Sequence, residues 1–87
     1  MPFHITQRQE KLLESFIRHD GYITGESLSE KLKVSPRTIR QDIKQLSGEL
    51  MKNGISLIAI PSKGYLLSKK DIEKAKAFLA SQKPARS

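Results

Sequence analysis

The chain has 87 residues and no cysteine, and its 16 Lys and Arg residues outnumber nine Asp and Glu residues to give a net charge of +7. A chain of this length forms one domain that buries only about 60% of its unfolded surface, so we expect no large catalytic cavity and no enzyme. Cysteine is absent and no apolar stretch approaches the roughly 18 residues that span a membrane, so we expect a cytoplasmic protein without membrane contact, metal or cofactor.

The excess of positive charge lies in the second half of the sequence. Residues 1–34 contain five basic and five acidic residues, whereas residues 35–87 contain eleven basic and four acidic residues. Such an uneven distribution is typical of a protein that binds a polyanion. A solubilising surface is the alternative interpretation of the same charges.

The first predicted element is a helix. Thr6 and Gln9 have the spacing of a capping box, in which each side chain satisfies a backbone N–H at the start of a helix. Apolar residues then repeat at helical spacing on one face: Leu12, Leu13, Phe16 and Ile17. We expect Asp20-Gly21 to end this helix in a turn.

A short strand and a second helix are expected next. Tyr22-Ile23 is the predicted strand, and Thr24 or Gly25 begins the helix. Leu28 and Leu32 lie four residues apart and therefore point to the same side, which we expect to be the core.

The third predicted helix has the strongest start signal in the sequence. Ser35-Pro36 combines a capping hydroxyl with a proline at the first helical position, where no hydrogen bond is lost. The helix is expected to run to Lys52 and to end at Asn53-Gly54. Its predicted buried stripe consists of Ile39, Ile43, Leu46 and Leu50.

A hairpin and a fourth helix complete the predicted domain. The segments 55–60 and 65–67 are β-prone, and turn residues separate them. Ser68 and Asp71 have the spacing of a second capping box. The fourth helix has an apolar edge that consists of Ile72, Ala75, Phe78 and Leu79. This edge could close the core of its own chain or pair with a second copy, and we favour a homodimer through it.

These elements predict an α+β, mainly α fold with a three-helix core, a β-hairpin wing and an extra C-terminal helix. The domain is expected to cover residues 1–82, with a helix-turn-helix at about 25–52, the wing at 55–67 and the last helix at 69–82. Residues 83–87 are expected to form a disordered tail.

The polar face of the third helix carries the predicted function. Opposite its buried stripe, the helix presents residue types that hydrogen-bond to base edges and phosphates in the major groove of double-stranded DNA. The candidate contacts in this helix are Ser35, Arg37, Thr38, Arg40, Gln41, Lys44 and Gln45. An ordinary solvated surface helix is the alternative interpretation.

Two other features of this region have more than one interpretation. Asp42 would repel phosphates, so we favour an ion pair with a nearby basic side chain over a contact to cytosine. The hairpin should close the core, and Ser62 and Lys63 at its tip could also touch phosphate or enter the minor groove.

The segments Thr24–Leu28 and Val34–Ile43, with Gly64–Leu67 at the end of the hairpin, resemble the winged helix-turn-helix family. The resemblance is to the N-terminal DNA-binding domains of the biotin operon repressor, of DeoR-type repressors, and of phosphotransferase-regulated activators and antiterminator-like regulators of sugar operons. It implies a bacterial transcription regulator that binds an operator or promoter through the third helix, with Lys63 extending from the wing. Lys33 stands where such turns commonly have glycine.

The resemblance also implies a longer natural protein, because effector and phosphorylation modules follow the DNA-binding domain in the sugar-operon regulators. We expect these modules to be absent from this fragment. A winged helix that contacts protein or RNA is the alternative function, since one fold hosts many functions. Catalysis is disfavoured because His4 and His19 have no evident partner, and His19 is explained by the dipole of the helix that it ends.

Overall fold

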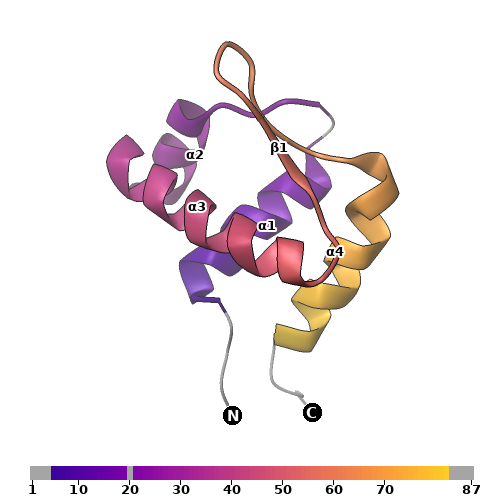
Figure 1. Cartoon of the computed structure of the whole chain (residues 1–87). Helices are drawn as coiled ribbons and strands as arrows, with labels where there is room; N and C mark the ends of the chain where they lie inside the picture. The colour runs from indigo at the N-terminus through magenta and orange to yellow at the C-terminus, as the bar shows by residue number, and fades with distance from the viewer. Residues whose placement is uncertain (1–4, 20, 83–87) are drawn as a thin grey trace.

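The computed structural model describes residues 5–19 and 21–82. These residues fold as α1 (Gln7–Arg18), α2 (Gly25–Leu32), α3 (Pro36–Lys52), β1 (Leu57–Ile60), β2 (Gly64–Leu67) and α4 (Lys69–Gln82). In Figure 1, α3 crosses in front of α1, α2 lies beside the first turns of α3, and the hairpin projects beyond the helices. The predicted α+β, mainly α class with a hairpin wing is confirmed.

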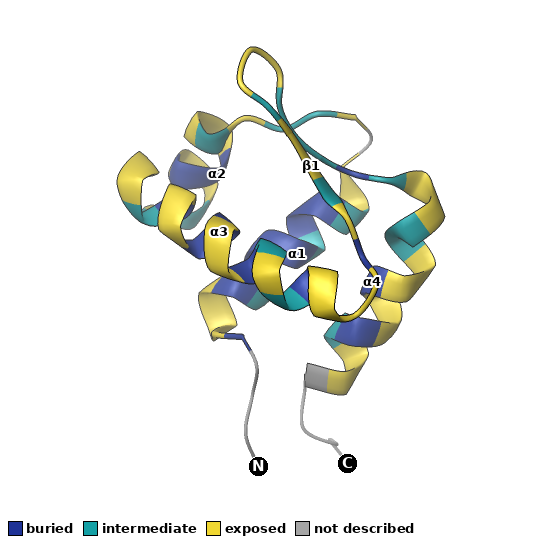
Figure 2. Cartoon of the chain, viewed as in Figure 1, coloured by how far each residue is buried: buried dark blue, intermediate teal, exposed yellow. Residues whose placement is uncertain are grey.

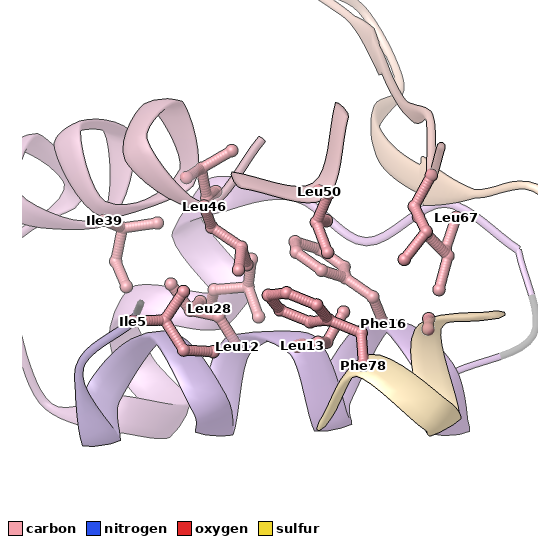
Figure 3. Close-up of a cluster of buried hydrophobic side chains, with 13 residues drawn as sticks. Ile5, Leu12, Leu13, Phe16, Leu28, Ile39, Leu46, Leu50, Leu67 and Phe78 are labelled. Carbon is pink, nitrogen blue, oxygen red and sulfur yellow. The ribbon is translucent and has the colours of Figure 1, made fainter. Parts of the chain in front are cut away.

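The hydrophobic core forms where α1, α2, α3 and α4 meet beneath the hairpin (Figure 3). The predicted stripe of α3 is buried throughout, because its apolar residues recur on one side of the helix. The other helices and the hairpin contribute Leu12, Leu13, Phe16, Leu28, Leu67, Ala75 and Phe78. This core fixes the side of α3 that faces inward, and therefore the side that faces solvent.

The first and third helices begin at the predicted caps. The Thr6 hydroxyl accepts a hydrogen bond from the Gln9 backbone N–H at 3.1 Å, and the Gln9 side chain accepts one from the Thr6 backbone N–H at 3.1 Å. The Ser35 hydroxyl accepts from the Thr38 backbone N–H at 3.2 Å, with Pro36 as the first helical residue. Both capping predictions are confirmed, since each satisfies a donor that the helix itself cannot.

The turn between α2 and α3 contains a lysine in the left-handed backbone region. Lys33 has φ 58° and ψ 43°, and its backbone N–H donates to the Ser29 carbonyl. This conformation ends α2 and lets the chain begin α3 three residues later, but it brings the side chain of an L-residue close to the backbone. The turn therefore has the geometry for which glycine is favoured.

We predict that Lys33→Gly stabilises the domain by about 0.5 to 1 kcal/mol, because the relief of left-handed strain exceeds the added entropy of the unfolded chain. Urea denaturation followed by circular dichroism measures the change. The matched control is Lys31→Gly inside α2, which should destabilise the domain by about 1 kcal/mol. A loss of stability in both variants would contradict the prediction.

The end of α3 explains why the hairpin begins later than predicted. The Ile55 backbone N–H donates to the Leu50 carbonyl at 2.9 Å, and the Gly54 N–H donates to the Met51 carbonyl at 3.1 Å, with Gly54 at φ 74°. This is a Schellman motif, and the buried Ile55 and Leu50 supply its hydrophobic contact. Ile55 therefore belongs to the helix end, and β1 begins only at Leu57.

The predicted strand at Tyr22-Ile23 is reduced to one bridge. Ile23 and Tyr65 exchange two backbone hydrogen bonds of 2.8 Å, while β1 and β2 pair along their whole length as an antiparallel hairpin. The expectation of a strand was wrong because Thr24 already caps α2 and leaves no room for a second pair. The bridge nevertheless ties the base of the wing to the segment before α2.

The start of α4 differs from the predicted capping box. The Asp71 carboxylate accepts a hydrogen bond from the Ser56 backbone N–H at 3.0 Å, so it serves the segment before β1 rather than the backbone of Ser68. The helix packs on α1, with Ala75 and Phe78 buried in the core of the same chain. Ile72 and Leu79 remain partly exposed, and pairing with a second copy stays a prediction.

Within the described residues, none of the helices has the length and apolar character needed to cross a membrane. Two predictions lie outside the described residues: the part that Asp20 plays in ending α1, and the tail at residues 83–87.

Candidate nucleic-acid interface

The outer surface of α3 is the candidate interface. Thr38 is half-buried, and the other predicted contacts are exposed: Ser35, Arg37, Arg40, Gln41, Lys44 and Gln45. Figure 2 shows exposed residues along the side of α3 that faces away from α1 and buried residues on the opposite side. These exposed side chains form an arc around the outer side of α3. The arc reaches from the side near the wing, at Arg40, to the side near α1, at Gln45.

The cations on this arc are free to meet an anion. Arg37, Arg40 and Lys44 make no ion pair with any residue in the described part of the chain. By contrast, Lys52 and Lys76 lie 3.3 Å and 3.6 Å from the carboxylates of Glu49 and Glu73. Arg37, Arg40 and Lys44 therefore place unpaired positive charge on the exposed side of α3, and Arg37 and Arg40 lie near its N-terminal end, where the helix dipole is also positive.

The wing tip lies on the same groove as the start of α3. Arg40, Ser62 and Lys63 all line a groove of about 510 Å³ that runs between the wing and the first turns of α2 and α3. Lys63 extends over the Tyr22 ring, with its Nζ 5.7 Å from the ring centroid. The structure thus brings the two wing candidates beside Arg40, whereas Arg37, Gln41 and Lys44 do not line this groove.

Asp42 makes the internal ion pair that its position predicted. The Arg8 guanidinium donates two hydrogen bonds to the Asp42 carboxylate, from Nε to Oδ2 and from Nη2 to Oδ1 at 3.3 Å. The hydrogen bond and charge of Asp42 raise the pKa of Arg8 above its ordinary value. Asp42 is buried, so its negative charge is neutralised inside the α1–α3 contact and is withheld from the outer surface of α3.

Three of the polar candidates already have partners within the domain. The Gln45 Oε1 accepts a hydrogen bond from the Gln9 Nε2 at 2.9 Å. The Ser35 and Thr38 hydroxyl oxygens lie 2.9 Å apart, and the Ser35 oxygen also caps α3. These hydroxyls and this amide are positioned by the protein before any ligand arrives.

Sequence reasoning missed the α1 residues that support the candidate interface. Arg8 and Gln9 lie 34 and 36 residues from their partners in α3. The Thr6–Gln9 spacing marked a helix start, but no local pattern indicated that the same amide would reach α3. Tyr22, beneath Lys63, was likewise assigned only to a strand.

The acidic and histidine side chains of the described residues form no metal-binding cluster. Within that part of the chain, no group of three or more His, Asp or Glu side chains could hold a metal ion. The His19 Nε2 lies 3.0 Å from the Tyr22 carbonyl oxygen, which requires the ring nitrogen to donate. His19 therefore has a structural partner in the turn after α1.

Two helices joined by a short turn, with a β-hairpin that lies beside the second helix, define a winged helix-turn-helix domain. A family model described as "HTH domain" matches residues 8–66, and the chain belongs to this helix-turn-helix family. No curated protein matches the chain significantly. Membership of the family supports a DNA-binding role.

Proposed function

We propose that the chain binds double-stranded DNA sequence-specifically, with α3 in the major groove and the wing against the neighbouring backbone. The observation that carries the proposal is the unpaired, exposed row of Arg37, Arg40 and Lys44 opposite a fully buried stripe. A helix held by its apolar side can enter a groove about 12 Å wide without disturbing the core.

The contacts divide by chemistry. Arginine donates in pairs to guanine O6 and N7, and glutamine pairs with adenine N6 and N7, so Arg37 and Gln41 are assigned to base edges. Lys44 and Lys63 are assigned to phosphates, together with the hydroxyls of Ser35, Thr38 and Ser62. Arg40, beside the wing, can reach either.

The biological role that we propose is transcription regulation. The resemblance of the Ser35–Ile43 segment to bacterial operon regulators supports a regulator that binds an operator or promoter, such as a sugar-operon activator, antiterminator-like regulator or repressor. In such a protein this domain would select the site, and effector or phosphorylation modules elsewhere would control it. Pairing of two copies through α4 would require two half-sites about one helical turn apart.

Selection from a randomised duplex DNA library with the purified chain tests the proposal. We expect enrichment of one motif, or of two copies of it at fixed spacing if the chain acts as a dimer. Recovery of the library without enrichment, at low and at physiological salt, would contradict sequence-specific binding.

Lys63→Ala is expected to weaken binding to all duplexes by a similar factor and to reduce the slope of log K against log salt concentration by about 0.9, because one phosphate contact is lost. Fluorescence anisotropy titrations at several salt concentrations measure both effects. Lys63→Arg keeps the charge at the wing tip and should keep the slope. A slope unchanged in Lys63→Ala would remove the wing tip from the phosphate contacts.

The alternative role, contact with protein or RNA, receives less support from the surface. Protein-binding helices present exposed apolar anchors, and among the described residues of α3 the exposed large hydrophobic side chain is Met51, one residue before the helix ends. The deep, narrow major groove of duplex RNA does not admit a helix as that of B-form DNA does. Binding of structured RNA in preference to duplex DNA in the same titrations would favour the alternative.

A further inference from the structure

Gln9 is the most buried polar side chain on α1, with 2% of its surface exposed, and both ends of its amide are occupied. The Oε1 accepts from the Thr6 backbone N–H at 3.1 Å, and the Nε2 donates to the Gln45 Oε1 at 2.9 Å. One amide therefore connects the start of α1 to the exposed surface of α3.

The backbone donor fixes the direction of this chain of hydrogen bonds. A backbone N–H can only donate, so the Gln9 atom that faces Thr6 must be the oxygen. The Gln9 nitrogen then faces α3, and because an amide nitrogen also only donates, the Gln45 atom that meets it must be an oxygen. The Gln45 oxygen is therefore held toward α1, and the Gln45 NH₂ group is the end of that side chain with no hydrogen bond to the described residues.

We propose that Gln9 is a positioning residue that sets the base preference of Gln45 by making it present hydrogen-bond donors. The inference rests on the proposed function and names a specificity rule for the same surface. A free glutamine pairs with adenine through its oxygen and its nitrogen together. With its oxygen held toward Gln9 and its NH₂ group turned away from it, Gln45 favours bases whose major-groove edge offers an acceptor oxygen, which are guanine through O6 and thymine through O4, over cytosine with its N4 amino group.

Gln9→Glu is the variant that reverses the rule. A carboxylate at this position still accepts from the Thr6 N–H and keeps the capping box, but it can only accept from Gln45. Gln45 must then turn its NH₂ group inward and its oxygen outward. The preferred base should change from guanine or thymine to one with an exposed amino group, cytosine or adenine.

The experiment compares the base preferences of the wild-type chain, Gln9→Glu, Gln45→Ala and the double variant, by selection from the same randomised duplex library and by anisotropy on duplexes that differ at one base pair. In the wild type we expect a roughly three- to tenfold preference at the position that Gln45 reads, the range of one hydrogen bond. In Gln9→Glu we expect the base preference at that position to be reversed. In Gln45→Ala and in the double variant we expect no base preference at that position.

Three results would overturn the inference. The wild-type preference could persist in a folded Gln9→Glu variant, Gln45→Ala could leave the motif unchanged, or Gln9→Glu could alter the preference when Gln45 is already absent. Thermal melting checks the fold of each variant. If Gln9→Glu does not fold, Gln9→Met keeps the volume without a polar atom, and the preference should then flatten rather than reverse.

A measurement without DNA separates this inference from the proposed function. In the free chain the side-chain NH₂ protons of Gln9 should exchange slowly with solvent, and Gln45→Ala should remove that protection. Fast exchange in the wild type would overturn the positioning role alone. Slow exchange without any selected motif would overturn the proposed function, and with it the base preference assigned to Gln45.

Discussion

Gly64→Ala is expected to destabilise the domain by about 2 to 4 kcal/mol and to detach the wing from the segment before α2. Gly64 has φ 110°, a conformation that side-chain-bearing residues rarely adopt. An added Cβ would lie 2.5 Å from the Ile23 carbonyl oxygen and 3.0 Å from the Thr24 Cα, and these backbone atoms are held by the Ile23–Tyr65 bridge. The backbone strain of a positive φ and the steric overlap of the added Cβ therefore both destabilise the Gly64→Ala variant. Urea denaturation gives the loss in free energy of unfolding.

The control for Gly64→Ala is the same substitution in α3. Gly48 is exposed, and an added Cβ there would meet nothing within 4 Å. Gly48→Ala should stabilise the domain by about 0.5 to 1 kcal/mol, because alanine restricts the unfolded chain and is the better helix former. Equal effects of the two substitutions would mean that the backbone at Gly64 relaxes freely, contrary to the tight packing described above.

Arg37→Ala and Gln41→Ala are each expected to weaken binding to the selected duplex by about 1 to 3 kcal/mol and to relax the base preference at one position. Both side chains are exposed on α3, so their removal should leave the free energy of unfolding nearly unchanged. Anisotropy titrations against the selected duplex and against single-base variants measure the two effects separately.

Lys76→Ala is the matched control for these interface variants. Lys76 lies on α4 near Ile17 and Arg18 of α1, and it pairs with Glu73 on its own helix. Its loss removes one positive charge without touching α3 or the wing, and affinity should change little at physiological salt. Unchanged affinity in Arg37→Ala and Gln41→Ala alike would contradict the assignment of α3 as the reading helix.

The elements that the sequence predicted well are those whose signals are local. The Thr6–Gln9 cap, the Ser35-Pro36 start, the buried stripe of α3 and the Asn53-Gly54 stop each depend on residues within a few turns, and all are present. The exposure of Arg37 and Gln41 follows from the same periodicity, because a helix buried on one side exposes the other.

The features that the sequence could not predict depend on contacts between distant segments. Nothing near Asp71 indicates that its carboxylate would serve the Ser56 N–H, 15 residues earlier, instead of its own helix. The partner of Asp42 could be expected to be basic, but its identity as Arg8 requires the crossing of α1 and α3. The single bridge at Ile23 similarly depends on where the wing folds back.

The Gln9–Gln45 hydrogen bond has a consequence for protein engineering. If α3 alone were grafted into another scaffold, the transplanted glutamine would arrive without the α1 amide that occupies its oxygen. We expect such a chimaera to lose the base selectivity of the parent at that position while keeping its attraction to DNA. A transferable reading unit would have to include the residues from Thr6 to Gln9 as well as the helix itself.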